Sequence, residues 1–179
     1  MYRKAKKLAG AALLGAVAVA VIQSCKTIPK GATAIKPFDA AKYAGQWYEI
    51  ARFDYRFERN LKNVTANYSF NDDGSIKVFN RGYDYKKNTW KDATGKAKFR
   101  GGKDEGKLKV SFFGPFYTGY NVIAIDPTYT YALVTGKNLN YLWLLSREKT
   151  MPRDIQASYL EKAKQIGYDT TKLVWVEHD

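Results

Sequence analysis

Histidine and cysteine are nearly absent from this chain of 179 residues, which has one of each. The histidine, His178, is the residue before the last, where we expect a frayed chain end. Histidine-based zinc sites, Ser-His-Asp or Cys-His nucleophiles and histidine general bases are therefore poorly supported. A single thiol also cannot form a disulfide within the chain. The sequence thus predicts a non-catalytic protein without a metal or another cofactor.

A long apolar run is also missing. The uncharged stretch near the N-terminus, residues 8–22, is shorter than the roughly 20 residues that a membrane-spanning helix needs. Four basic residues lie before this stretch, an order that is typical of a secretory signal peptide. We therefore interpret residues 1–24 as a signal peptide that is removed.

The only cysteine, Cys25, directly follows this segment. Residues 22–25, with the sequence IQSC, resemble the bacterial lipobox. The resemblance implies that the thiol takes a diacylglyceryl group, that the peptide is cut before Cys25, and that the new amine is acylated. Two or more acyl chains anchor a protein stably to a membrane, whereas one does not. We expect residues 25–37 to form a lipidated, extended tether; an ordinary signal peptide or an uncleaved anchor stays open.

No block of like charges is present either. The formal net charge of the chain is +13, and about +9 remains once the four basic residues of the signal peptide are removed. Lysines are scattered through the predicted strands, a distribution that favours a solvated outer face, and no nucleic-acid-binding motif is present. We expect no nucleic-acid partner, while a cationic face near anionic lipid headgroups stays open.

Short segments with a period of two fill most of the chain after residue 45, and turn residues separate them. The pattern predicts eight strands at residues 46–53, 64–70, 76–84, 89–100, 107–113, 120–126, 131–135 and 141–147. Short hairpin connections indicate an up-and-down antiparallel meander. Closure into a barrel removes the exposed sheet edges. We therefore predict an all-β, eight-stranded antiparallel barrel domain over residues 38–179.

Two of these strands, 120–125 and 141–145, are apolar on both faces, so another element must cover their outer side. A helix that starts near Pro152 and ends at Gly167 is expected to do so. Its apolar stripe is Ile155, Tyr159, Ala163 and Ile166. Residues 173–176 are predicted to form a short final strand.

Glu49 shares its parity with Trp47 and Ala51, which aims its carboxylate into the barrel. A buried carboxylate needs a partner. An ion pair or a tyrosine hydrogen bond is the interpretation that we favour, and a role facing a ligand stays open. Carboxylate catalysis would also have to use this residue.

Residues 45–52, with the sequence GQWYEIAR, are similar to the G-x-W signature of the lipocalins, preceded by a helical turn at residues 38–43. Residues 142–147 are similar to the third conserved lipocalin region, and the middle region, 125–129, keeps its aspartate but displaces its tyrosine. The resemblance implies that Gly45, Trp47 and Arg147 form the structural motif of the family, in which Arg147 lies over Trp47 and closes the floor of the barrel. Residues 109–116 and 119–123 look specifically like the bacterial outer-membrane lipoprotein lipocalins, relatives of apolipoprotein D and of plant temperature-induced lipocalins.

The resemblance implies a cavity that binds fatty acids, lysophospholipids or similar amphiphiles for storage or transport in the cell envelope. It also implies a lipid anchor on the periplasmic side of an outer membrane. A lipocalin-fold enzyme that acts on a lipid, a filled barrel that serves as an interaction module, and a homodimer all stay open. The residues that we expect to line the cavity are Ala66, Tyr68, Asn80, Phe99, Val110, Phe112, Tyr120, Val122, Tyr141 and Trp143.

Overall fold

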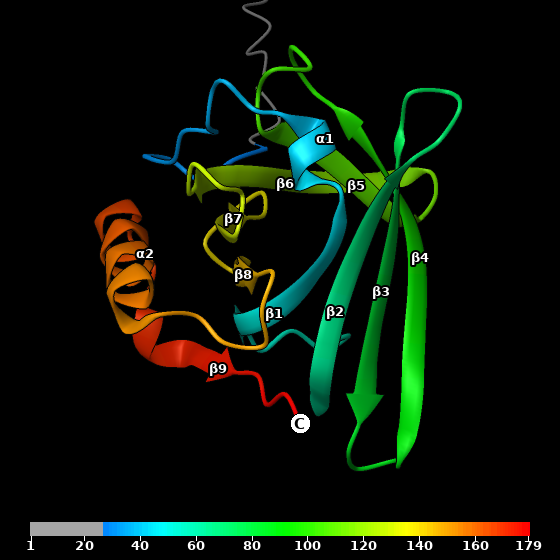
Figure 1. Cartoon of the computed structure of the whole chain (residues 1–179), viewed down its shortest axis with the longest axis vertical. Helices are drawn as coiled ribbons and strands as arrows, with labels where there is room; N and C mark the ends of the chain where they lie inside the picture. Colours follow the sequence, from blue (N-terminus) through cyan, green and yellow to red (C-terminus); the bar gives the residue numbers. More distant parts are fainter. Residues whose placement is uncertain (1–26) are drawn as a thin grey trace, which may run out of the picture.

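Eight antiparallel strands form a closed barrel in the computed structural model, which describes residues 27–179 (Figure 1). Each strand pairs with the next along the chain, and β1 pairs with both β2 and β8, so the sheet closes. The predicted fold class is confirmed. The strands are β1 (Gly45–Phe53), β2 (Leu61–Phe70), β3 (Ile76–Asp84), β4 (Thr89–Phe99), β5 (Lys107–Phe113), β6 (Phe116–Ile125), β7 (Tyr131–Thr135) and β8 (Leu142–Ser146).

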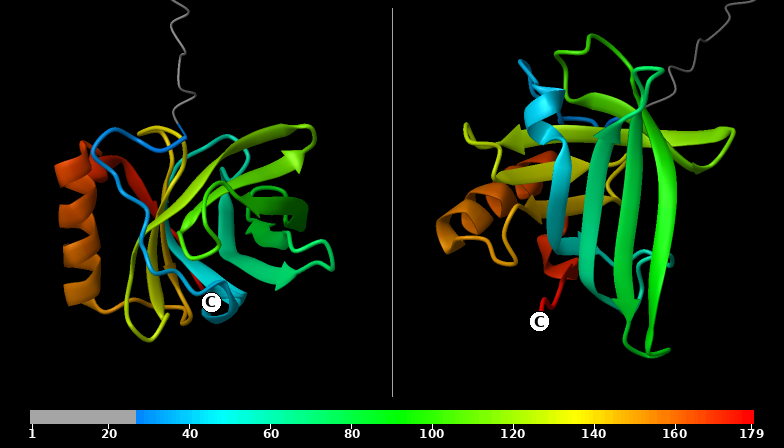
Figure 2. Two further views of the ribbon diagram at one scale, coloured as in Figure 1. Left: turned by 90° about the horizontal axis from the view of Figure 1, so that it is seen from above. Right: turned by 45° about the vertical axis from the view of Figure 1, so that its right-hand side comes forward.

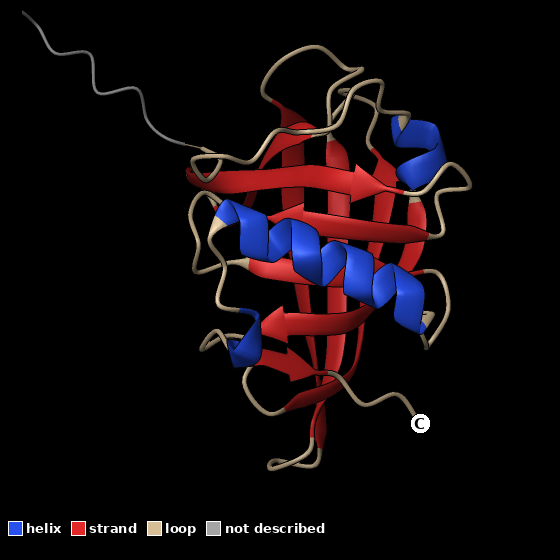
Figure 3. Ribbon diagram, turned by 90° about the vertical axis from the view of Figure 1, so that its left-hand side faces the viewer, coloured by secondary structure: helices blue, strands red, loops and turns tan. Residues whose placement is uncertain are grey.

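The long helix α2 (Arg153–Ile166) lies outside the barrel, across the strands of one wall (Figure 3). Pro152 precedes the helix, and Gly167 ends it in the left-handed conformation, with a φ of 106°. Tyr159 and Ala163 are buried against the sheet. The predicted covering helix is therefore present, because it buries the outer face of strands that are apolar on both sides.

Three short elements complete the fold. The helix α1 (Ala40–Tyr43) precedes β1 at one end of the barrel, and Asp39 caps it by accepting the N–H groups of Ala41 and Lys42. The 3₁₀ turn η1 (Thr170–Lys172) leads into β9 (Leu173–Trp175), which pairs with the end of β1 outside the barrel. No helix within residues 27–179 is long and apolar enough to cross a membrane.

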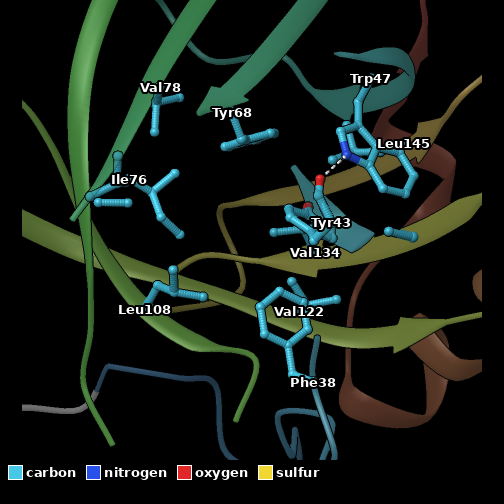
Figure 4. Packing of buried hydrophobic residues seen from close by; sticks show 13 residues of the cluster. Phe38, Tyr43, Trp47, Tyr68, Ile76, Val78, Leu108, Val122, Val134 and Leu145 are labelled. Carbon is cyan, nitrogen blue, oxygen red and sulfur yellow. Dashed lines mark hydrogen bonds between the residues drawn. The ribbon is translucent and has the colours of Figure 1, made fainter. Parts of the chain in front are cut away.

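Apolar side chains form one cluster on each side of the barrel wall. The inner cluster lies inside the barrel and includes Trp47, Tyr68 and Val122 (Figure 4). The outer cluster lies between the wall and α2 and includes Leu133, Leu144 and Ala163. This division explains why β6 to β8 are apolar on both faces, since each face packs against a different cluster.

The segment at residues 27–37 is bound to the barrel and is not the free, extended tether that we expected. Ile35 donates to Val122 O and accepts from Gly106 N, both at 2.9 Å, and Ala34 is buried. Figure 2 shows this segment in blue, running along the barrel to α1. Apolar contacts and backbone hydrogen bonds outweigh the freedom of a short polar linker here. The predicted signal peptide and Cys25 lie outside the described residues.

The C-terminal tail is also bound, which corrects the prediction of a frayed end. His178 Nε2 lies 2.8 Å from Glu49 O, and the imidazole ring packs edge-on against Tyr48, with centroids 5.4 Å apart. Val176 N donates to Ile50 O at 2.9 Å. The tail thus continues the pairing of β9 along β1, and a residue near the end of the chain becomes part of the barrel wall.

Candidate ligand-binding cavity

One end of the barrel is closed by a contact between Trp47 and Arg147. Trp47 is fully buried, and the Arg147 Cζ atom lies 3.9 Å from the centroid of its ring. The Trp47 Nε1–H group donates to Tyr43 O at 2.8 Å (Figure 4). The contact that the lipocalin resemblance implies is therefore present. A guanidinium on the face of an indole is an attractive cation–π geometry.

Arg147 also holds α1 across this end. Its guanidinium donates to the carbonyl oxygens of Lys42 at 2.7 Å, Ala44 at 2.9 Å and Gln46 at 2.6 Å. These are carbonyls at and just after the end of α1, which have no partner within the helix. Gly45 has a φ of 91°, and a Cβ atom there would lie 3.4 Å from Arg147 Nη1. Glycine suits this position because of both its backbone angle and the nearby guanidinium.

The displaced tyrosine of the middle region still belongs to this end. The Tyr129 hydroxyl accepts from Asp39 N at 2.8 Å, and Tyr129 O accepts from Arg147 Nε at 3.2 Å. Asp126 accepts backbone N–H groups of Thr128, Thr130 and the following residue. Burial acts to raise the pKa of Asp126, but these hydrogen bonds hold it below its ordinary value. Although the motif departs from the usual one, Tyr129 therefore still links Asp39 and Arg147 at the closed end of the barrel.

Above this floor the barrel encloses a cavity of about 100 Å³. Its lining is mostly apolar, with a few polar side chains from several strands. Seven of the ten residues that we expected to line it do so. The complete lining is Tyr43, Glu49, Glu58, Val64, Thr65, Ala66, Tyr68, Ile76, Val78, Asn80, Ala97, Leu108, Val110, Phe112, Tyr120, Trp143 and Leu145.

The other three expected residues lie around the cavity without lining it. Phe99 packs against Phe38 near the floor, with ring centroids 6.5 Å apart. Val122 is fully buried in the inner cluster. Tyr141 precedes β8 and stacks on Trp143 at a centroid distance of 6.1 Å. Parity identified the inward face of each strand, but it could not tell how far along the barrel the open space extends.

Three tyrosine hydroxyls meet at the bottom of the cavity. The Tyr120 hydroxyl lies 2.6 Å from that of Tyr43 and 2.8 Å from that of Tyr68. Burial raises the pKa of all three phenols, so the hydroxyls stay protonated at neutral pH. Their hydrogen bonds to one another satisfy polar groups that would otherwise be costly inside an apolar cavity.

A β-bulge in β1 places an ion pair inside the barrel. The pairing with β8 shifts between Glu49 and Ala51. Parity predicted that Ala51 points into the barrel, but because of this shift it packs in the outer cluster. The same shift turns Arg52 inward, where its Nη1 lies 2.8 Å from Glu49 Oε1. Both side chains are almost completely buried. Glu49 therefore has the ion-pair partner that we favoured, and its side chain also lines the cavity.

A second carboxylate, that of Glu58, reaches the cavity from the connection between β1 and β2. Trp143 Nε1 donates to Glu58 Oε2 at 3.4 Å, and Arg52 Nη2 donates to Glu58 O. Burial raises the pKa of Glu49 to about 8, with Glu58 adding to the shift and Arg52 opposing it. Burial likewise raises the pKa of Glu58. The cavity thus contains two carboxyl groups and one guanidinium, an arrangement in which burial raises the pKa of both carboxyls and the guanidinium lowers it.

The comparisons with known proteins agree with this architecture. A family described as "Lipocalin-like domain" matches residues 38–178. The chain is 48% identical over 164 residues to "Outer membrane lipoprotein Blc" of Escherichia coli (strain K12), covering 90% of this chain and 93% of that protein. It is 38% identical over 155 residues to "Temperature-induced lipocalin-1" of Arabidopsis thaliana, covering 78% of each.

Solved structures with low sequence identity share the fold. The cockroach allergen Per a 4 matches with a TM-score of 0.66 at 19% identity, covering 86% of this chain and 96% of that chain. Insecticyanin from the tobacco hornworm matches with a TM-score of 0.65 at 19% identity, covering 83% and 85%. The closed barrel, the floor contact and the family match together assign the fold without ambiguity, and the chain belongs to the lipocalin family.

Proposed function

We propose that this chain binds fatty acids, lysophospholipids or similar amphiphiles in its barrel, for storage or transport in the cell envelope. The observation that carries the proposal is the mostly apolar cavity above the Trp47 floor, with only a few polar groups in its lining. Apolar walls with a few placed polar groups are typical of sites for small lipophilic molecules. Affinity would come mainly from buried acyl carbons, at about 0.8 kcal/mol per methylene.

We further propose that the chain is anchored through acylated Cys25 to the outer membrane and faces the periplasm. The lipobox-like residues 22–25 support this location, as do relatives that are named outer membrane lipoproteins. Binding, not catalysis, is the activity that we propose. Of the groups inside the cavity, Glu49 or Glu58 would have to act as the base or acid of a catalytic alternative, and Glu49 is already paired with Arg52.

The size of the cavity defines the second candidate function. A volume of about 100 Å³ is smaller than the roughly 300–1,000 Å³ of most small-molecule pockets. A long acyl chain therefore requires side chains such as Phe112 or Trp143 to rotate away from the axis of the barrel. If they do not, the barrel is filled by its own side chains and serves as an interaction module of the envelope.

Tryptophan fluorescence tests the proposal, because Trp143 lines the cavity. Titration with a lysophospholipid or a fatty acid is expected to change the emission of the parent chain. Phe112→Arg places a charge in the cavity and is expected to abolish the change while the far-ultraviolet circular dichroism is retained. Phe70→Arg is the matched control, because this phenylalanine is 52% exposed and ends β2 at the floor end, away from the cavity mouth. Equal binding by both folded variants would contradict the proposed site.

A further inference from the structure

Exposed aromatic side chains surround the end of the barrel opposite the Trp47 floor. Phe57, Phe113 and Phe116 are 54%, 71% and 79% exposed, and we call these three residues the aromatic rim. Phe57 comes from the connection between β1 and β2, and its ring centroid lies 6.2 Å from that of Phe113 at the end of β5. Two connections therefore meet there and present apolar rings together. Exposed apolar patches of this kind mark surfaces for proteins or membranes.

The connections between strands differ in charge at the two ends of the barrel. The connections at the rim end, residues 54–60, 85–88, 114–115 and 136–141, contain five basic and two acidic residues. The strand connections at the floor end, residues 71–75, 100–106 and 126–130, contain two basic and five acidic residues. At the rim itself, the Arg56 guanidinium lies 4.5 Å from the centroid of the Phe57 ring. An anionic surface would therefore attract the rim end more strongly than the floor end.

The start of the described chain lies on the same side as the rim. Asn121 Nδ2 donates to Thr27 O at 2.8 Å, and Gly119 lies against both Thr27 and Lys137. Gly119 is three residues from Phe116 along β6, and Lys137 belongs to a connection at the rim end. Cys25 precedes Thr27 by two residues, a reach of about 7 Å. If Cys25 is acylated, as the proposed function requires, the acyl chains would therefore be attached near the open end of the barrel.

From these observations we propose that the rim end of the barrel docks on the surface of a bilayer that contains anionic phospholipid. The aromatic rim would enter the interfacial region, where such rings are favoured, and the basic residues would lie among the headgroups. An amphiphile could then pass between the bilayer and the cavity without crossing bulk water. A second copy of the chain fits this surface less well, because two rim ends of the same positive sign would face each other.

The docking test uses unlipidated protein, so that it does not depend on the anchor. Residues 27–179, produced without the anchor, contain every strand, helix and apolar cluster that the structure describes. This protein is mixed with vesicles of phosphatidylcholine, with and without phosphatidylglycerol, and separated by flotation. We expect binding to the vesicles with phosphatidylglycerol, and release at high salt because the headgroup attraction is screened.

Variants locate the surface that binds. The double substitution Phe113→Ser and Phe116→Ser is expected to weaken binding at least about tenfold, as is Lys86→Glu with Lys87→Glu. Phe70→Ser is the matched control, because this phenylalanine is 52% exposed but ends β2 at the floor end. Its binding to vesicles is expected to equal that of the parent chain.

Three results would overturn the docking proposal. They are the absence of binding to either vesicle, equal losses for the rim and Phe70 variants, and a dimer that depends on the rim in the absence of vesicle binding. A parallel titration with a soluble lysophospholipid separates this proposal from the function above. Ligand binding without docking contradicts only the membrane surface, whereas docking without ligand binding contradicts the proposed cavity function.

Discussion

Arg147→Met removes the contact that closes the floor, and its effect on stability can be worked out from the geometry. The cation–π contact of the half-buried guanidinium contributes about 1 kcal/mol. The hydrogen bonds to the carbonyls of Lys42, Ala44 and Gln46 add about 2 kcal/mol together, a reduced figure because solvent reaches some of the acceptors. We therefore expect the free energy of unfolding to fall by about 3 kcal/mol, a large part of the 5–15 kcal/mol of a typical domain.

Urea unfolding followed by circular dichroism measures this loss. With a slope of about 2 kcal/mol per molar urea, the midpoint is expected to fall by about 1.5 M. Arg147→Lys keeps the charge but not the planar fork, so an intermediate loss is expected. Arg153→Met, at the exposed start of α2, is the control and should change stability by less than about 0.5 kcal/mol. If Arg147→Met unfolds at the same urea concentration as this control, the floor contact does not stabilise the barrel.

Three further predictions concern the interior. Because the raised pKa of Glu49 means that the folded state holds a proton, its contribution to stability is complete below pH 4.5 and is lost as pH rises through about 8. Thermal melts across this range should therefore fall with pH, and Glu49→Gln should flatten the slope; an unchanged slope would contradict the assignment. Gly45→Ala should lower the free energy of unfolding by about 1–3 kcal/mol in urea because of its positive φ. Tyr120→Phe removes the hydroxyl that joins two others and should cost about 1–2 kcal/mol in the same assay, whereas an unchanged midpoint would show that the three hydroxyls are not coupled.

Strands could be predicted from sequence wherever one face is apolar and the other polar. In β5, Leu108 and Val110 alternate with lysines, and both side chains line the cavity. The covering helix followed from the same logic, because two strands with apolar outer faces require a partner. These features depend on the local period of the chain, which a sequence contains directly.

The bulge in β1 could not be predicted in this way. A single extra residue reverses the parity of everything after it, so the inward assignment of Ala51 was wrong, and Arg52 points into the barrel. Glu58 was not identified as a cavity residue, because a connection of seven residues has no period that could show where its side chains point. The ion-pair cluster of the cavity therefore depends on irregular backbone, which sequence patterns do not reveal.

The predictions for the two ends of the chain were wrong for a related reason. Residues 27–37 and His178 bind through a few long-range hydrogen bonds, such as those of Ile35 and Glu49 O. No local pattern marks such bonds, since the partner lies about a hundred residues away. Composition alone then favours a free tether or a frayed tail, even where the chain is held.

Whether the barrel holds an amphiphile is tested most directly by native mass spectrometry of the chain after gentle extraction from its own membranes. The account predicts one co-purified lipid per chain, which is absent from Phe112→Arg and still present in Phe70→Arg, whose exposed side chain lies at the floor end. A parent chain that is consistently empty, and that stays empty after addition of fatty acid and lysophospholipid, would contradict it and identify the barrel as filled by its own side chains.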